Sequence, residues 1–252
     1  MGGMYTDLAE FYDATYSSKD YRKEAARVAD FARRAGRSGG REWLDVACGT
    51  GRHLEYLSRQ FHCTGVDASP QMLRVARRRL RGVRLLRGDM RSLRLGRQFD
   101  VISCLFSGIG HVRTLAALRQ TIRTFAQHLK PGGVLLFEPW FSRETWIPGM
   151  VHLLTASTPN LTIARMSFSS VRGNQSVLEM HYLVGRKGRG VLHAAVTEYS
   201  GLFDRGTTLR FLREAGLQPR YLHRGLLPGR GLFIAVRPAV ATRPRVRPRP
   251  SR

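Results

Sequence analysis

The stretch that decides the fold is residues 43–51, Trp-Leu-Asp-Val-Ala-Cys-Gly-Thr-Gly, together with the acid Asp67 further along the chain. A short apolar run leads into a glycine-rich turn and a helical pattern, and a second apolar run then ends at Asp67. This order is typical of a nucleotide site in an α/β protein, because glycines let the backbone approach a ligand and an acid after the next strand binds ribose hydroxyls. A Gly-x-Gly turn can also be a plain connection, but the acid favours a site. No third glycine follows Gly51, so we expect a nucleoside cofactor without phosphates.

The segments around this stretch alternate between strand-like and helical patterns. Ser69 and Pro70 supply a capping residue and a first-turn proline for one of the helices. Five short apolar runs separated by helices predict an α/β protein with a doubly wound, mostly parallel sheet, as in Rossmann-like proteins. The expected helical segments are 5–35, 52–60, 70–81 and 113–129, and the expected strands are 42–47, 62–67, 83–87, 99–106 and 134–138.

The pattern changes after Pro139, where the helical period fades and alternating runs appear. These runs predict an antiparallel β insertion after the fifth strand, with strands at 161–166, 176–184 and 191–196. A helix at 206–215, which begins after Asp204 and stops at Gly216, then returns the chain to the sheet. The last strand is expected at 230–237.

Three regions follow from this pattern. Residues 1–138 and 199–237 are expected to form a cofactor-binding core with an N-terminal helical lid. Residues 139–198 are expected to form one wall of the substrate pocket and a homodimer seam. The arginine- and proline-rich tail, 238–252, has no acids, and we expect it to be disordered.

The formal net charge of +24 and the pI near 11.5 are values that nucleic-acid-binding proteins often have. Only four of the basic residues are lysines, however, and the arginines are spread along the whole sequence. This scatter favours a solvated basic surface over a nucleic-acid interface, although the charge leaves a nucleic-acid-binding protein open as an alternative.

The three cysteines, Cys48, Cys63 and Cys104, show no metal-binding spacing and lie in or beside apolar runs. They predict reduced, buried thiols in a cytoplasmic protein that uses no metal. No apolar segment reaches the roughly 18 residues of a membrane span. The N-terminus has no signal-peptide pattern, so we expect neither secretion nor a membrane partner.

Ligands of such sheets bind outside the carboxyl ends of the strands. Asp67 suits ribose hydroxyls there, and Asp89 suits the exocyclic amine of an adenine held between Ala68 or Met72 and Met90. Each of these residues has an ordinary alternative as a turn or core residue, but all of them fall at one edge of one sheet. The other residues expected at this edge are Asp45, Ala47, Gly49, Gly51, Leu105, Phe106, Glu138, Pro139 and Trp140.

The order of these motifs resembles the class I S-adenosylmethionine-dependent methyltransferases. That resemblance covers about residues 40–140 and rests on 44–51, Gly65-Val66-Asp67, Gly88-Asp89-Met90, Phe99-Asp100-Val101 and 129–133. A narrower resemblance, to the N,N-dimethyltransferases of nucleotide-linked amino sugars, spans nearly the whole chain. Its motifs are Tyr12-Asp13, Lys19-Asp20-Tyr21, 106–111, Glu138-Pro139-Trp140, 180–184 and 229–233. Leu105 stands where we expect a methionine, which leaves the particular sugar open.

The resemblance implies roles for individual residues. Ala47, Asp67, Asp89, Met90 and Leu105 would line the cofactor site, with Tyr21 near the methionyl end of S-adenosylmethionine, and His111 would reach the amine. The residues implied to contact the nucleotide sugar are Tyr12, Glu138, Pro139, Trp140, Arg165 and Arg230.

Two of these residues also have physical arguments of their own. An amine must lose its proton before it can attack a methyl group, and the imidazole of His111 ordinarily titrates near neutrality. His111 could instead orient the amine or cap the following helix. Arg230 lies between two glycines that clear its path, and a guanidinium suits a diphosphate.

The sequence therefore predicts a cytoplasmic enzyme that uses S-adenosylmethionine to methylate, twice, the amino group of a dTDP-linked deoxysugar. The alternatives are a methyltransferase for another small amine or a hydroxyl, a basic nucleic-acid-binding protein or nucleic-acid methyltransferase, and a cofactor-binding module without activity.

Overall fold

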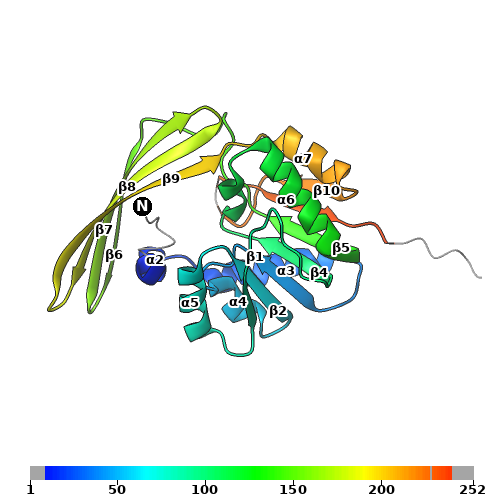
Figure 1. Ribbon diagram of the computed structural model, residues 1–252, viewed down its shortest axis with the longest axis horizontal. Coiled ribbons are helices and arrows are strands. Elements are labelled where there is room, and N and C mark those ends of the chain that lie inside the picture. Colours follow the sequence, from blue (N-terminus) through cyan, green and yellow to red (C-terminus); the bar gives the residue numbers. More distant parts are fainter. Residues whose placement is uncertain (1–8, 228, 240–252) are drawn as a thin grey trace, which may run out of the picture.

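The computed structural model describes residues 9–227 and 229–239, which form a seven-stranded sheet and a separate four-stranded sheet (Figure 1). The strand order of the larger sheet is β10-β11-β5-β4-β1-β2-β3, and only β11 runs antiparallel to the other strands. This confirms the predicted doubly wound, mostly parallel α/β fold. Its strands are β1 (Glu42–Val46), β2 (His62–Asp67), β3 (Arg84–Arg87), β4 (Phe99–Cys104), β5 (Leu129–Phe137), β10 (Gln218–Leu222) and β11 (Leu232–Val236).

Helices cover both faces of the larger sheet. One hydrophobic cluster joins the sheet to α6 (Leu115–His128) and α7 (Arg205–Glu214). A second cluster, on the other face, joins it to α3 (Tyr21–Ala35), α4 (Arg52–Leu57) and α5 (Pro70–Arg79). The central strands are buried on both faces, which explains why they read as continuous apolar runs.

The predicted helix boundaries rest on capping side chains that the structure contains. Ser69 Oγ accepts a hydrogen bond from Met72 N at 3.2 Å, with Pro70 in the first turn of α5. Asp204 Oδ1 accepts one from Thr207 N at 2.7 Å at the start of α7. Both caps satisfy backbone donors that have no partner within the helix.

The four-stranded sheet is the predicted insertion and follows β5 directly. Its strands are β6 (Val151–Thr158), β7 (Leu161–Arg172), β8 (Gln175–Arg186) and β9 (Gly190–Gly201), and every neighbouring pair is antiparallel. In Figure 1 this sheet projects away from the larger one, with α2 (Ala9–Thr15) close to it. The inner face carries a third hydrophobic cluster, which includes Phe11 of α2, Ile163 and Tyr182.

Several predicted elements were wrong in detail. The single helix over 5–35 is two helices, because the chain turns at 16–20 and Asp20 then caps α3 by accepting a bond from Lys23 N. Residues 5–8 lie outside the described residues. The helix predicted at 113–129 is preceded by a separate 3₁₀ turn, η1 (Gly108–Val112), and the strand predicted at 99–106 ends at Cys104.

Strands β6 and β10 were not predicted at all. Most of β6 is exposed, and its sequence shows no clear alternation, so that only its pairing with β7 makes it a strand. Most of the predicted disordered tail, residues 240–252, lies outside the described residues. Within the described part of the chain, no helix is long and apolar enough to cross a membrane.

The glycine turn after β1 gives a prediction for stability. Gly51 has φ = 77°, and a Cβ added there would lie 2.5 Å from Leu80 Cδ1. Gly39 has a similar φ of 72° but nothing within 4 Å of such a Cβ. We expect Gly39→Ala to lower the free energy of unfolding by about 1–2 kcal/mol, the cost of a left-handed alanine, and Gly51→Ala to lower it by about 1–3 kcal/mol more through overpacking. Urea unfolding of both variants measures the difference, and equal losses would show that Leu80 moves aside freely.

Candidate active site

A cavity of about 640 Å³ opens where β1, β2 and β4 end and the segment after β3 begins. Its lining brings together most of the residues predicted to bind the cofactor. They are Ala47, Gly49, Asp67, Ala68, Met72, Asp89, Met90, Leu105 and Phe106, and the predicted substrate residue Tyr12 and the predicted catalytic residue His111 line it as well.

Asp67 is held rigidly at the end of β2. Its Oδ2 accepts a hydrogen bond from Gly49 N and its Oδ1 one from Ser69 N, both at 2.8 Å. Burial raises the pKa of the carboxyl, while the backbone donors oppose this shift. Each carboxylate oxygen can accept more than one hydrogen bond, so the fixed carboxylate can still receive the hydroxyls of a ribose.

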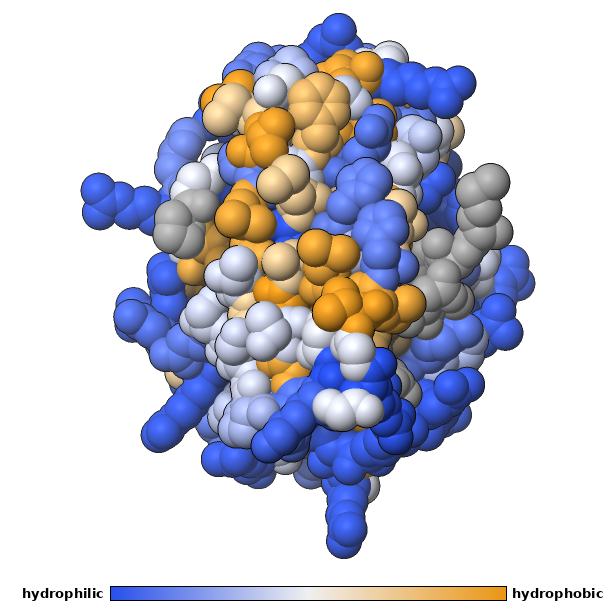
Figure 2. Space-filling view, turned by 90° about the vertical axis from the view of Figure 1, so that its left-hand side faces the viewer, coloured by the Kyte–Doolittle hydropathy of each residue, from blue (hydrophilic) through white to orange (hydrophobic). Residues whose placement is uncertain are grey.

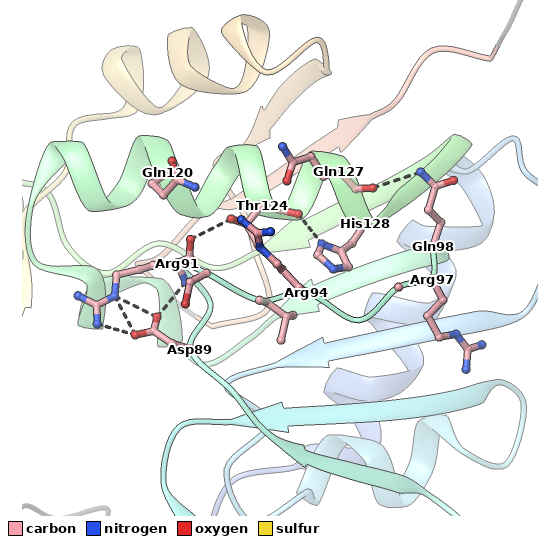
Figure 3. A pocket seen from close by; sticks show the side chains of 12 residues that line it. Asp89, Arg91, Arg94, Arg97, Gln98, Gln120, Thr124, Gln127 and His128 are labelled. Carbon is pink, nitrogen blue, oxygen red and sulfur yellow. Dashed lines mark hydrogen bonds and ion pairs between the residues drawn. The ribbon is translucent and has the colours of Figure 1, made fainter.

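Asp89 lies at the rim of this cavity and is more exposed. Arg91 Nε donates to both of its carboxylate oxygens at 3.0 Å, and this contact lowers the pKa of Asp89 (Figure 3). The two methionines, Met72 and Met90, contribute apolar walls nearby. Thioether side chains adapt to a flat ring, so this part of the cavity suits a purine base.

Three residues predicted to bind the cofactor are not among the lining residues. Asp45 is 2% exposed and accepts a 2.6 Å hydrogen bond from Ser103 Oγ, which itself receives one from Trp43 Nε1. Burial raises the pKa of Asp45 to about 6. Gly51 packs under Leu80, and the Tyr21 ring lies beneath cationic side chains and against the edge of His53.

A second cavity, of about 720 Å³, lies between α2, the insertion sheet and the core. Four of the predicted substrate residues line it: Tyr12, Trp140, Arg165 and Arg230. Tyr12 and Phe106 line both cavities, which therefore adjoin at these two rings. One ligand in each cavity would meet the other there.

The cationic side chains of the second cavity are held by specific contacts. Arg230 Nη1 donates to Ser107 Oγ at 2.8 Å, and its guanidinium lies 4.5 Å from the ring centroid of Trp140. Arg165 Nη1 donates to Tyr16 OH at 3.1 Å. Stacked and hydrogen-bonded guanidinium groups are preorganised for an anion with several oxygen acceptors, such as a diphosphate.

The turn between β4 and η1 separates the two cavities and has an unusual backbone. Phe106 and Ser107 have φ of 50° and 61°, in the left-handed region that non-glycine residues rarely adopt. The buried carboxylate of Glu138 accepts a 2.7 Å hydrogen bond from Phe106 N, and Ser107 Oγ donates to Pro139 O at 2.8 Å. Glu138 and Pro139 therefore shape this turn and are not among the residues that line the second cavity.

His111 lies on η1 and lines the first cavity, to which its side chain is exposed. Desolvation, with a smaller contribution from Arg113, lowers its pKa to about 4. The imidazole is therefore neutral at physiological pH. A neutral ring nitrogen can accept a hydrogen bond but is a weak acceptor of a proton from an ammonium group.

The structure adds site residues that sequence reasoning missed. Tyr16 and Lys19 line the second cavity from the turn after α2, and Glu198 lines it from β9. Lys19 forms an ion pair with Glu24 and lies 4.4 Å from the ring centroid of Phe106. For Glu198 the alternation along β9 was an available signal, since it shares a face with the buried Val196.

Another hollow, of about 940 Å³, lies beyond the Asp89–Arg91 pair, beside α6 (Figure 3). Its polar groups bond mainly to one another: Thr124 Oγ1 donates to Arg91 O, and His128 Nε2 accepts from Leu95 N at 3.1 Å. These bonds tie the segment after β3 to α6. We therefore assign this hollow a structural role.

Comparison with known proteins places this geometry in a family. Residues 44–133 match the methyltransferase domain family. The chain is 40% identical, over 91% of its length and 98% of the relative's, to the dTDP-3-amino-3,4,6-trideoxy-alpha-D-glucopyranose N,N-dimethyltransferase of Streptomyces venezuelae. This chain belongs to the amino-sugar N,N-dimethyltransferase family. The resemblance predicted from the motifs is thereby confirmed.

Solved structures agree with this family membership. The crystal structure of Streptomyces venezuelae DesVI matches with a TM-score of 0.87 and 39% identity, covering 93% of this chain and 99% of DesVI. CalS10, an amino pentose methyltransferase from Micromonospora echinaspora solved with bound SAM, matches with a TM-score of 0.82 and 37% identity, covering 94% of this methyltransferase and 99% of CalS10.

The contact between Glu138 and Phe106 gives a second prediction. Glu138→Leu leaves the Phe106 N–H without a partner, and we expect a loss of about 1–3 kcal/mol in the free energy of unfolding. Glu138→Gln keeps an oxygen acceptor and should lose less. The exposed Glu144, in the segment that follows, serves as the control: Glu144→Leu should change stability by at most about 0.5 kcal/mol. If Glu138→Leu matched this control, the turn would not depend on the carboxylate.

Proposed function

We propose that this methyltransferase transfers methyl groups from S-adenosylmethionine to the amino group of a dTDP-linked amino-deoxysugar, and does so twice. The observation that carries the proposal is the pair of cavities that adjoin at Tyr12 and Phe106. The first offers an acid for a ribose and flat apolar walls for a purine. The second offers fixed guanidinium groups for a diphosphate.

The adenosine of the cofactor would lie along Asp67, Asp89, Met72 and Met90, with its sulfonium near the junction of the cavities. The nucleotide sugar would enter the second cavity with its diphosphate at Arg230 and Arg165. Its amine would then meet the methyl group beside Phe106, where the two cavities adjoin. Alignment of this kind supplies about 7–11 kcal/mol of the barrier reduction in favourable intramolecular reactions.

His111 would orient the amine in this arrangement. Because its imidazole is neutral, a ring nitrogen can accept a hydrogen bond from the amino group and direct the lone pair towards the methyl group. The low pKa argues against the role of general base that the sequence left open for this residue. The described residues contain no group of three or more histidine, cysteine, aspartate or glutamate side chains that could hold a metal ion.

The decisive experiment is mass spectrometry of a panel of acceptors incubated with the enzyme and S-adenosylmethionine. The panel contains dTDP-linked sugars with the amine at C3 or C4, their 3- or 4-hydroxy counterparts and a mixed oligonucleotide. We expect two added methyl groups, on an amino sugar alone, once the reaction is complete. Methylation of a hydroxy sugar or of the oligonucleotide would instead support one of the alternatives raised by the sequence.

Arg230 gives a prediction specific to the nucleotide sugar. Arg230→Ala removes a charged hydrogen-bond donor worth about 1.5–3 kcal/mol, so we expect KM for the amino sugar to rise about 10- to 150-fold. Arg78→Ala removes the same charge from an exposed position on α5 and should leave KM unchanged. Calorimetry with S-adenosylmethionine should give the same affinity for both variants. Equal losses of both ligands in Arg230→Ala would contradict the assigned position.

We further propose that two copies pair through the outer face of the insertion sheet. This face carries exposed hydrophobic side chains on neighbouring strands, and Figure 2 shows hydrophobic residues gathered on this side of the molecule. Leu153 is 65% exposed and pairs across the strands with Met166, which is 53% exposed. The same face of one sheet can contact itself around a two-fold axis, and a monomer rarely leaves such a patch open.

Leu153→Glu tests this pairing. Two carboxylates brought together at a two-fold apolar contact would repel each other and be desolvated, so we expect the variant to be monomeric in light scattering coupled to size exclusion. Leu115→Glu, which charges an exposed leucine on α6, should leave the dimer intact. A monomeric wild-type protein would contradict the proposal outright.

A further inference from the structure

The second cavity presents an electrostatic problem to the acceptor, and this inference rests on the proposed function. An amino sugar enters as an ammonium ion near neutral pH, yet it must meet a sulfonium in a cavity that is mostly cationic. The cations that line the cavity are Lys19, Lys23, Arg27, Arg165 and Arg230, and the acids are Asp20, Glu24 and Glu198. An acid must therefore offset the charge of the amine.

Two of these three acids are already engaged. Asp20 Oδ1 accepts the 2.8 Å bond from Lys23 N that caps α3. The buried Glu24 pairs with Lys19 and with His53 Nε2, the latter at 2.9 Å. These contacts fix both carboxylates to α3 and α4.

Glu198 differs from both. It lies on the inner face of β9, opposite Leu178 of β8, and its Oε1 is buried with no hydrogen-bond partner. A buried acceptor without a partner is costly unless a ligand supplies the donor. The location fits such a ligand, because β9 packs against η1, which carries His111, and Ser200 of β9 lies next to Gly110.

We propose that Glu198 binds the protonated amino group of the acceptor and takes the proton that the amine must lose before each methyl transfer. The proton moves from nitrogen to the carboxylate, which leaves a neutral amine with its lone pair. The nitrogen then attacks the methyl carbon as the carbon–sulfur bond breaks, so the sulfonium becomes a neutral thioether and the product an ammonium. Glu198 releases its proton to solvent and repeats the step for the second methyl group.

The surroundings of Glu198 suit this task. It is faced by Arg165 from β7, Tyr182 from β8, Tyr16 from the turn after α2 and Arg113 after η1. Desolvation outweighs the two arginines and raises its pKa to about 7, whereas the pKa of His111 falls to about 4. A proton acceptor works best when its pKa is close to the working pH, which favours Glu198 over His111.

The test compares Glu198→Gln with the wild type for methylation of an amino sugar. We expect kcat/KM at about pH 7 to fall about 100- to 10,000-fold, the range for loss of a proton-transfer group. At about pH 9 the amine arrives partly deprotonated, so the deficit should shrink. Glu214→Gln, an exposed acid at the end of α7 outside both cavities, should behave as the wild type. His111→Asn should keep the pH dependence of the wild type.

A stability measurement separates this role from a structural one. Because the pKa of Glu198 is raised from 4.5 to about 7, the unfolded chain ionises first and the wild type loses stability as pH rises through this window. Glu198→Gln should therefore unfold at a higher temperature than the wild type above about pH 7 while being less active.

The outcomes are distinguishable. If the wild type methylates no amino sugar, the proposed function fails and the role of Glu198 fails with it. If the wild type does so and Glu198→Gln equals it at about pH 7, only the role of Glu198 is overturned. An equal loss at both pH values, with weaker binding of S-adenosylmethionine in calorimetry, would also overturn it, because that pattern indicates a structural defect.

Discussion

The site depends on one buried hydrogen bond, from Phe106 N to the carboxylate of Glu138. Two consecutive residues hold a left-handed backbone there, at a cost of about 1–2 kcal/mol each, and only the surrounding contacts keep them in it. Phe106 lines both cavities, while Ser107 links Pro139 O to the guanidinium of Arg230. The same turn therefore sets the wall between the two cavities and the position of a cation in the second cavity.

Acidic and basic side chains of the site lie in different places, whereas the arginines of the whole chain are scattered along the sequence. Two acids, Asp67 and Asp89, line the first cavity, where we propose that the hydroxyl and amino groups of the cofactor lie. In the second cavity the cations are stacked or hydrogen-bonded, as Arg230 is on Trp140 and Arg165 is to Tyr16. A net charge of +24 says little about ligands, whereas two desolvated guanidinium groups beside a cavity indicate an anion.

The sequence predicted the parts of the molecule that local chemistry determines. Continuous apolar runs, capping residues such as Ser69 and Asp204, and the acid after β2 all lie where expected. It did not predict β6 and β10, since their residues become strands only by pairing with partners distant in sequence. The sequence also could not predict the pKa values of His111 and Glu198. These values arise from packing between the insertion sheet, η1 and α2 rather than from neighbours in the chain.

The short helix α2 connects the glycine turn of the core to the insertion sheet. A helix of seven residues is unstable by itself in water, so α2 depends on tertiary contacts with the core and with the insertion sheet. Asp13 accepts a 2.6 Å hydrogen bond from Thr50 in the glycine turn and pairs with Arg79 of α5, while Phe11 packs into the core of the insertion sheet. Tyr12, which lies between these two residues, lines both cavities. This one helix therefore fixes the glycine turn and the insertion sheet relative to each other. A change at Phe11 or Asp13 must therefore affect the junction of the two cavities, where we propose that the two ligands meet.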